Sequence, residues 1–256
     1  MREKYPVLQF DRLKIYFGEP YTIPCRHGEI TLLSPTIGDI ISLGEAKFYS
    51  ALNIIVANTT SYRAFLWDLQ LDWNEVSDFE LFCMIYKGIN PEASGLLFGD
   101  LDFSLFEVKV LNTVAEKKLV LANEEQNVEI DEDVYQQMHQ YYQLMFNMHP
   151  EDLLTNEERM KRWWIAKDKR EQERKAKKKD DKSYSIQPII SALVNHPGFK
   201  YKLQELREVG VAEFYDSVQR LQIYEQSTAL LKGLYSGMIS GKDIKPEQYN
   251  FMKEIN

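Results

Sequence analysis

The sequence predicts an α+β protein that is mainly α-helical. Three observations predict this class. Apolar residues recur at steps of three and four over most of the chain, two segments alternate like β-strands, and residues 161–182 are almost wholly charged. We therefore expect an N-terminal domain of helices with two small antiparallel β-meanders (1–154), a charged helix or tether (155–184) and a C-terminal helical module (185–256).

Length and composition exclude several classes of protein. The chain has 256 residues, of which 44% are hydrophobic, and this is enough to bury a core without disulfide support. Nine prolines and twelve glycines exclude low-complexity material. The net charge of −8 argues against a surface built throughout for nucleic acid. The chain begins without a secretory signal, and no apolar run approaches the ~20 residues of a membrane helix, so we expect a cytosolic protein that binds no membrane.

The first β-meander is predicted over residues 13–33. Short strand-like runs occupy Leu13–Phe17, Tyr21–Ile23 and Glu29–Leu33. They are separated by segments that contain Gly18, Pro20 and Gly28, which favour turns. Three short strands joined by tight turns predict a small antiparallel sheet.

Three helices are predicted to follow. Ser34 and Pro35 form a helix start, and the apolar stripe behind them runs to about Asn58. A second helix is expected from Thr59 or Ser61. The third begins at Ser77, because Glu80 stands at the spacing of a capping box, and it is expected to close near Gly88.

A second β-meander and a further helix complete the N-terminal domain. Helical periodicity is lost between Phe98 and Ile130, where strand-like runs occupy 105–111, 118–121 and 128–130. Asp131 is expected to cap the next helix, whose apolar side chains share one face. These side chains are Val134, Met138, Tyr141, Tyr142, Met145 and Met148.

The segment from Thr155 to Lys182 is predicted to be a charged helix or tether. Thr155 and Glu158 match a second capping box, and Trp163 and Trp164 follow. Residues 161–182 include eleven basic and five acidic residues, so this segment carries +6, while the remaining 20 basic and 34 acidic residues carry −14. So few apolar residues cannot bury a face, and a boundary between domains is expected here.

This charged segment is also a candidate basic patch. Basic residues beside aromatic ones can bind nucleic acid or an anionic membrane surface. Glu171 and Glu173 interrupt the positive charge, however, and a mixed-charge run is more often a solvated helix, so we favour that interpretation. The candidate patch consists of Lys167, Lys169, Arg170, Arg174, Lys175, Lys177, Lys178 and Lys179.

The C-terminal module is predicted to be helical. One helix is expected over 186–194, stopped by His196–Gly198, and a longer one from Val211 to Gly237. Pro246 is expected to begin a last short helix. The candidate partner-binding residues are the aromatic side chains of this module, although aromatic residues at helical spacing are more often buried in a core. They are Phe199, Tyr201, Phe214, Tyr215, Tyr224 and Tyr235.

Recognisable catalytic, cofactor and metal motifs are absent from the sequence. There is no GxSxG nucleophile turn, no HExxH pair and no Gly-rich phosphate loop. The four histidines show no metal-ligand spacing, and Cys25 and Cys83 form no CxxC motif. Acidic pairs such as Asp100 with Asp102 lie where turns and helix caps favour them. We therefore expect no enzymatic activity, no cofactor and no metal.

Two groups of segments resemble a family of phage proteins. Residues 30–50, 58–67 and 73–82 resemble proteins encoded in the tail module of long-tailed phages that infect Gram-positive bacteria. Residues 195–210, 214–221 and 230–237 resemble the same group. Within it, the chain is most similar to the tail assembly chaperones.

This resemblance implies a function without catalysis. Tail assembly chaperones bind the tape measure protein and help to recruit tail tube protein in the cytoplasm of the infected cell, and they are left out of the mature virion. Self-association is a further possibility. Two other hypotheses stay open: a permanent structural component of the tail or baseplate, and a nucleic-acid-binding or host-directed factor that uses residues 161–182. Nucleic acid is the less favoured partner.

Overall fold

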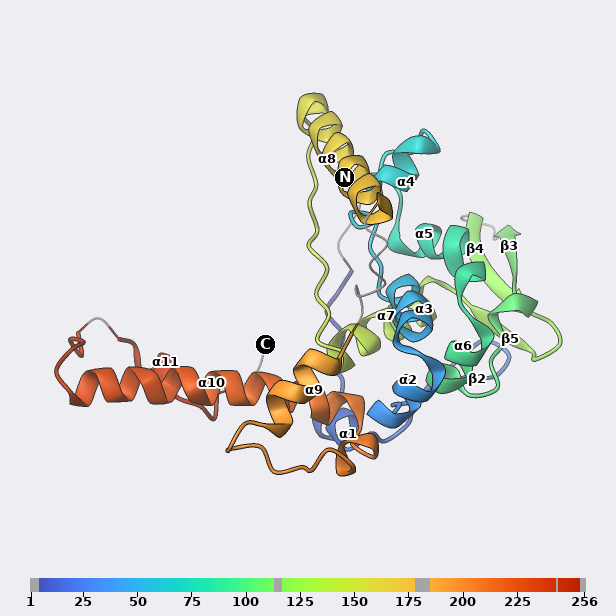
Figure 1. Cartoon of the computed structure of the whole chain (residues 1–256). Coiled ribbons are helices and arrows are strands. Elements are labelled where there is room, and N and C mark those ends of the chain that lie inside the picture. The colour runs from blue at the N-terminus through green and yellow to red at the C-terminus, as the bar shows by residue number, and fades with distance from the viewer. Residues whose placement is uncertain (1–4, 113–116, 178–184, 243, 254–256) are drawn as a thin grey trace.

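The computed structural model describes residues 5–112, 117–177, 185–242 and 244–253 (Figure 1). Helices make up most of the described elements, and the strands form two small antiparallel sheets. The predicted class, α+β and mainly α, is confirmed. Figure 1 shows a body from which two long helices, α8 and α10, extend in different directions.

The first sheet is a two-stranded hairpin and not a three-stranded meander. Strand β1 (Tyr21–Pro24) pairs with β2 (Glu29–Leu32), with Tyr21 opposite Leu32. The predicted first strand is instead helix α1 (Arg12–Tyr16), because the Asp11 side chain accepts bonds from the free N–H groups of Leu13 and Lys14. The local cap therefore outweighs the short alternation of apolar residues.

The helix predicted from Ser34 is divided into two. Helix α2 (Ile37–Leu43) begins after Thr36, which forms a capping box with Asp39, and α3 (Glu45–Ile55) follows Gly44. Gly44 has φ +99°, a backbone conformation that residues with a side chain rarely adopt, and this conformation ends α2. The next predicted helix is the short α4 (Arg63–Asp68).

The capping box at Ser77 and Glu80 is confirmed, and it starts helix α5 (Asp78–Ile85). A 3₁₀ turn, η1 (Tyr86–Gly88), closes this helix where it was predicted to end. Helix α6 (Pro91–Phe98) was not predicted, although Asn90 caps it and Pro91 occupies its first turn. Its start signal was therefore present in the sequence.

The second meander is confirmed. After the 3₁₀ turn η2 (Phe103–Leu105), strands β3 (Glu107–Asn112), β4 (Lys117–Asn123) and β5 (Val128–Ile130) form an antiparallel sheet in chain order. Asp131 caps α7 (Glu132–Met145) as predicted, by accepting a bond from Val134 N. Helix α7 lies at the centre of the body and buries Tyr135, Met138 and Tyr142.

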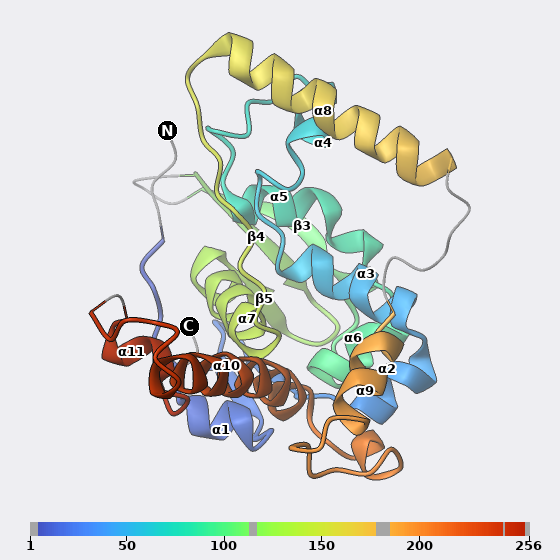
Figure 2. The ribbon, with the colours of Figure 1, turned by 60° about the vertical axis from the view of Figure 1, so that its left-hand side comes forward.

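The C-terminal half is helical. Helix α8 (Glu158–Lys177) lies across the body beside α4 (Figure 2). Helix α9 (Gln187–Val194) buries Leu193 in the main core, and the 3₁₀ turn η4 (Glu205–Arg207) lies against α2. Helix α10 (Val211–Tyr235) is the longest described helix, and α11 (Pro246–Tyr249) lies alongside it. The second capping box predicted at Thr155 does not form, because α8 begins only at Glu158 and Thr155 Oγ1 accepts from Glu157 N at 3.2 Å.

The main hydrophobic core is continuous between the N-terminal body and the start of the C-terminal module. Leu206, Val211 and Phe214 are buried in one cluster with residues of α2, α3 and α7. Gly38 in α2 allows this contact, since a Cβ atom there would lie 2.6 Å from the carbonyl oxygen of Arg207. The predicted domain boundaries at 154 and 184 remain predictions. Residues before 154 and residues after 184 both contribute to this core.

Candidate functional site

Among the described residues, the most exposed apolar surface of the C-terminal module lies on residues 221–242 and 244–253, which we call the C-terminal arm. It comprises the distal part of α10, the turn after it, α11 and the segment up to Lys253. Figures 1 and 2 show this arm extending beyond the body. In the part of the chain that the structure describes, the main contact of the arm is internal: α11 packs against α10.

Local interactions reverse the chain at the end of α10. Gly237, which was predicted to stop the helix, has φ +72°, and the N–H groups of Met238 and Ile239 both donate to the carbonyl of Gly233, at 3.0 and 3.1 Å. Ile239 then packs so close to Gly233 that a Cβ atom there would lie 2.5 Å from its Cδ1. A glycine at position 233 therefore lets the chain fold back onto the helix.

Arg220 holds the returning segment in place. Its Nη1 donates to the carbonyl oxygens of Phe251 and Lys253, at 2.7 and 2.8 Å. Charge-assisted bonds of this kind are among the stronger hydrogen bonds in proteins. The segment is thereby positioned beside α10, and the ring of Phe251 meets that of Tyr224 edge to face at 5.6 Å.

A groove forms between α10 and the returning segment. Its volume is about 530 Å³. Beyond the groove, Tyr235 is 83% exposed and Met238 87% exposed, while Met252 at its rim is 76% exposed. Large apolar side chains that gather on one part of a surface mark sites of protein–protein contact. The residues that line the groove are Gly198, Arg220, Leu221, Tyr224, Phe251 and Met252.

The six aromatic residues named from the sequence do not share one surface. Tyr224 and Tyr235 are exposed on the arm, whereas Phe214 is 0% exposed and belongs to the core. Tyr215 is half-buried, and its hydroxyl lies 2.7 Å from that of Tyr49. The two remaining side chains, Phe199 and Tyr201, are half-buried and pack on each other with ring centroids 5.7 Å apart.

Sequence reasoning missed the other arm residues, Met238, Phe251 and Met252. Their signal was that apolar side chains continue after Gly237, where the predicted last helix is too short to bury them. Tyr201 also differs from a free surface residue, because its hydroxyl donates to Glu213 and this bond raises its pKa to about 12. The Tyr201 hydroxyl is therefore already hydrogen-bonded within the C-terminal module.

The candidate basic patch is divided between two faces of α8. Lys169 lies on the face toward the body and forms an ion pair with Asp68. Lys178 and Lys179 lie outside the described residues. The other members of the patch are exposed to solvent: Lys167, Arg170, Arg174, Lys175 and Lys177.

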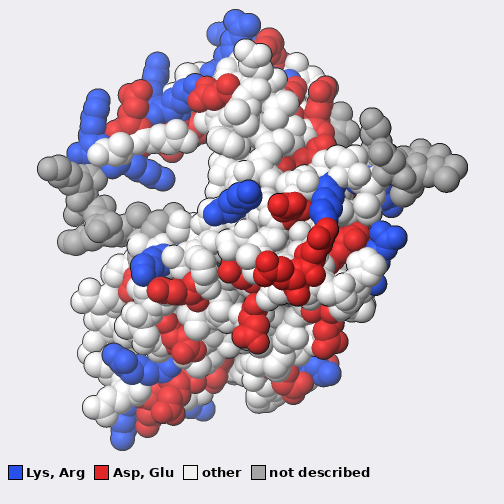
Figure 3. Space-filling model, turned by 90° about the vertical axis from the view of Figure 1, so that its right-hand side faces the viewer, with Lys and Arg blue, Asp and Glu red and all other residues white. Residues whose placement is uncertain are grey.

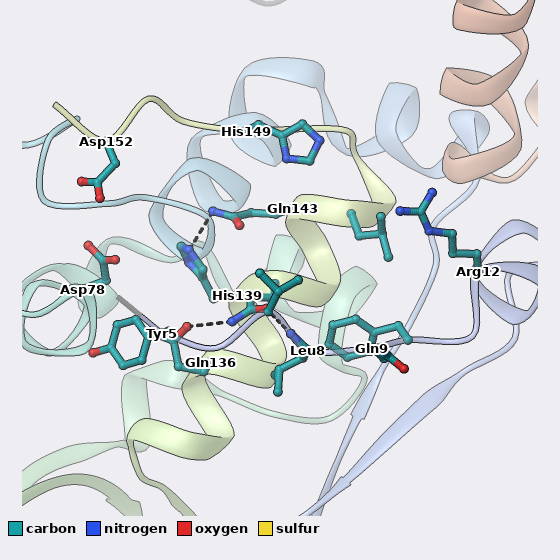
Figure 4. A pocket seen from close by; sticks show the side chains of 14 residues that line it. Tyr5, Leu8, Gln9, Arg12, Asp78, Gln136, His139, Gln143, His149 and Asp152 are labelled. Carbon is teal, nitrogen blue, oxygen red and sulfur yellow. Dashed lines mark hydrogen bonds between the residues drawn. The ribbon is translucent and has the colours of Figure 1, made fainter. Parts of the chain in front are cut away.

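A cavity of about 650 Å³, lined by both apolar and polar side chains, lies between residues 5–12 and α7 (Figure 4). His139 lines it, and its Nδ1 lies 2.9 Å from the carbonyl oxygen of Ile55. Since a carbonyl can only accept, Nδ1 carries the proton and donates, which leaves Nε2 to accept from Gln143 at 2.7 Å. Asp78, another lining residue, accepts from Thr59 N at 2.8 Å. His139 thus links α7 to the end of α3, and Asp78 links α5 to the segment before α4, so both side chains have a structural role.

The two thiols are poor nucleophiles in this fold. Burial raises the pKa of Cys25 to about 11 and that of Cys83 to about 12, so both are protonated at neutral pH. Among the described residues, no three His, Cys, Asp or Glu side chains are grouped so that they could hold a metal ion. None of the helices in the described ranges is both long enough and apolar enough to cross a membrane.

The C-terminal part of the chain matches a known family. Residues 176–256 match the family model described as the YomV second domain, a phage-associated family. The match covers the end of α8, all of α9 to α11 and therefore the whole C-terminal arm. Searches of curated proteins and of solved structures found no match. The C-terminal module is thus similar to a phage-associated domain.

Proposed function

We propose that this protein is a phage tail assembly chaperone, which binds the tape measure protein through the C-terminal arm and helps to recruit tail tube protein without catalysis. The arm would take an amphipathic helix of the client into its groove, as apolar grooves do in other helix-binding proteins. Recruitment would take place in the cytoplasm of the infected cell, before the mature virion is complete.

One observation carries the proposal: the arm exposes large apolar side chains on a part of the molecule that extends away from the core. Tyr235, Met238 and Met252 are each more than three-quarters exposed. Water contact with such surface is unfavourable, at roughly 25 cal/mol per Å² of apolar area, so a partner that covers it gains affinity. Arg220 fixes the backbone on both sides of Met252, and the turn after Gly237 fixes Met238 at the end of α10, so these side chains are positioned before any partner binds.

Two further findings support the phage context. The arm lies within the segment that matches the phage-associated domain. Segments at both ends of the chain resemble proteins of the phage tail module. Catalysis plays no part in the proposal, because binding of this kind needs only a complementary surface.

Co-expression with the tape measure protein of the same phage tests the proposal. The protein should form a soluble complex that is recovered in a pull-down. The variant that combines Tyr235→Ser, Met238→Ser and Met252→Ser should lose at least about tenfold in affinity, because three contacts of about 0.5–1 kcal/mol each disappear. A matched control combines Leu69→Ser and Val110→Ser, which change exposed apolar residues on the body and should leave binding intact. Equal binding by both variants would contradict the proposal.

A permanent tail component is the rival function. Mass spectrometry of purified particles separates the two, because a chaperone should be absent or far below the stoichiometry of the tail proteins. Recovery of the protein at full stoichiometry would replace the chaperone proposal with the structural one.

A further inference from the structure

Helix α8 is held to the body along one face only. Ile165 is buried in a cluster with Leu66 and Trp73, and Arg63 binds Asp168 through two bonds, of 2.6 and 2.7 Å. Ion pairs of Lys161 with Asp72 and Lys169 with Asp68 lie on the same side. The side chains on the inner face of α8 therefore already contact the body.

The outer face of α8 carries a row of side chains that we call the α8 stripe. They follow one another at steps of four, three, four and three residues, which places them on one side of the helix. All are exposed, and Trp163 is 56% exposed. At ~1.5 Å per residue the stripe is about 21 Å long. Its members are Trp163, Lys167, Arg170, Arg174 and Lys177.

Helix geometry places the acidic residues at the edges of this stripe and not along its centre. At ~100° per residue, Glu171 and Glu173 lie about 80° to either side of its centre. The centre of the stripe is therefore basic, while Glu171 and Glu173 lie along its two edges, four residues from Lys167 and from Lys177. In Figure 3, Lys and Arg side chains project from the upper part of the molecule, with Asp and Glu among them, whereas Asp and Glu predominate over the middle of the same view.

We infer that the α8 stripe is a docking surface for an acidic, helix-forming segment of a partner protein. A partner helix with Glu or Asp at the same steps would place a carboxylate opposite each of Lys167, Arg170, Arg174 and Lys177. Trp163 would pack against an apolar side chain at one end, with Lys167 Nζ already 5.8 Å from its ring centroid. This inference concerns residues outside the C-terminal arm and does not depend on the tape measure protein.

The same features fit a short acidic helix better than nucleic acid. Platforms for single strands stack successive bases on several aromatic rings, and the stripe has one. A polyanion longer than the stripe would also reach the rest of the molecule, where 20 basic and 34 acidic residues leave a charge of −14. At physiological salt the Debye length is ~8 Å, so a partner confined to the outer face of α8 avoids this repulsion.

Fluorescence anisotropy with a labelled synthetic helix tests the inference. The probe carries Glu at steps of three and four along one face and Leu at one end, and its counterpart carries Gln in place of Glu. The intact protein should bind the Glu probe, and the affinity should fall as salt is raised. The Arg170→Glu and Arg174→Glu double variant should bind at least about tenfold more weakly, because two attractive pairs become repulsive.

Controls separate the stripe from general charge effects. The Lys87→Glu and Lys200→Glu double variant makes the same change in net charge at exposed sites elsewhere, and it should bind within about twofold of the intact protein. Circular dichroism should show unchanged helix content in both variants, since neither alters the inner face of α8. Equal loss in both variants, or equal binding of the Glu and Gln probes, would overturn the inference.

Tighter binding of a single-stranded oligonucleotide than of the Glu probe would also overturn it, in favour of nucleic acid. The stripe variant should still recover the tape measure protein through the arm. Failure of the arm experiment therefore leaves this inference standing, and failure here leaves the proposed function standing.

Discussion

Helices α8 and α10 extend from the same body but are held to it by different forces. Helix α8 docks through ion pairs and one buried apolar side chain, Ile165, and it presents charge to solvent. Helix α10 docks through Val211 and Phe214 in the main core, and its distal end presents apolar side chains. The comparison shows that a long helix attached along only part of its surface can present either charged or apolar side chains to solvent.

The difference also separates attachment to the body from exposure to solvent along each helix. In α10 the attached part and the exposed part are separated along the helix axis, because Val211 and Phe214 at its start are buried and Tyr235 at its end is exposed. In α8 they are separated around the axis, because the inner face is paired and the outer face is not packed on the body. Substitutions at the attached part should therefore change stability, and substitutions at the exposed part should change binding.

Phe214→Ala should have the largest effect on stability. Removing a fully buried phenylalanine ring leaves a cavity and typically costs about 3–5 kcal/mol, and here it would also loosen the attachment of α10. Urea denaturation measures the free energy of unfolding. Tyr235→Ala, in the exposed end of the same helix, serves as the matched control and should change it by less than about 0.5 kcal/mol. Similar losses in both variants would contradict the division of α10.

Asp168→Ala should have the next largest effect. It leaves the buried Arg63 guanidinium without its carboxylate and should cost about 2 kcal/mol, with faster hydrogen exchange in α8. Lys169→Ala, which breaks a more exposed pair on the same face, should cost less than about 1 kcal/mol. If the two variants lost equal stability, the ion pair of Arg63 would not be the main attachment of α8.

Asp216→Asn should have a smaller effect that depends on pH. Burial, and less strongly the nearby Glu213, raise the pKa of Asp216 above its ordinary value, despite the opposing charge of Arg220. The folded state thus binds this proton more tightly, so the ionised carboxylate costs stability above the folded pKa. The variant should be more stable than the intact protein at neutral pH, and the difference should vanish below the ordinary pKa of an aspartate.

Thermal unfolding at a series of pH values measures this difference. Asp11→Asn is a useful comparison, because Asp11 is an exposed cap whose amide replacement keeps a hydrogen-bond acceptor. A difference between Asp216→Asn and the intact protein that stays constant down to low pH would show that Asp216 acts through packing and not through its charge.

The sequence by itself determined the elements that depend on neighbours only a few residues away. The capping box at Ser77, the cap at Asp131, the helix stop at Gly237 and the three strands of the second sheet all followed from local patterns. Two errors were also local: Asp11 and Asn90 are caps whose short helices were not predicted from the sequence. Helices of five and eight residues are too short to show a clear period.

Tertiary structure alone decided which side chains of regular helices face the core. Phe214 and Tyr235 both lie in one predicted helix, yet one is buried and the other is exposed, because only the proximal turns of α10 meet the body. Likewise, Lys169 and Arg170 are neighbours in one charged run, but only Lys169 faces an aspartate. Helical periodicity specifies the angle between side chains, whereas the position of the partner surface sets which of those angles is buried.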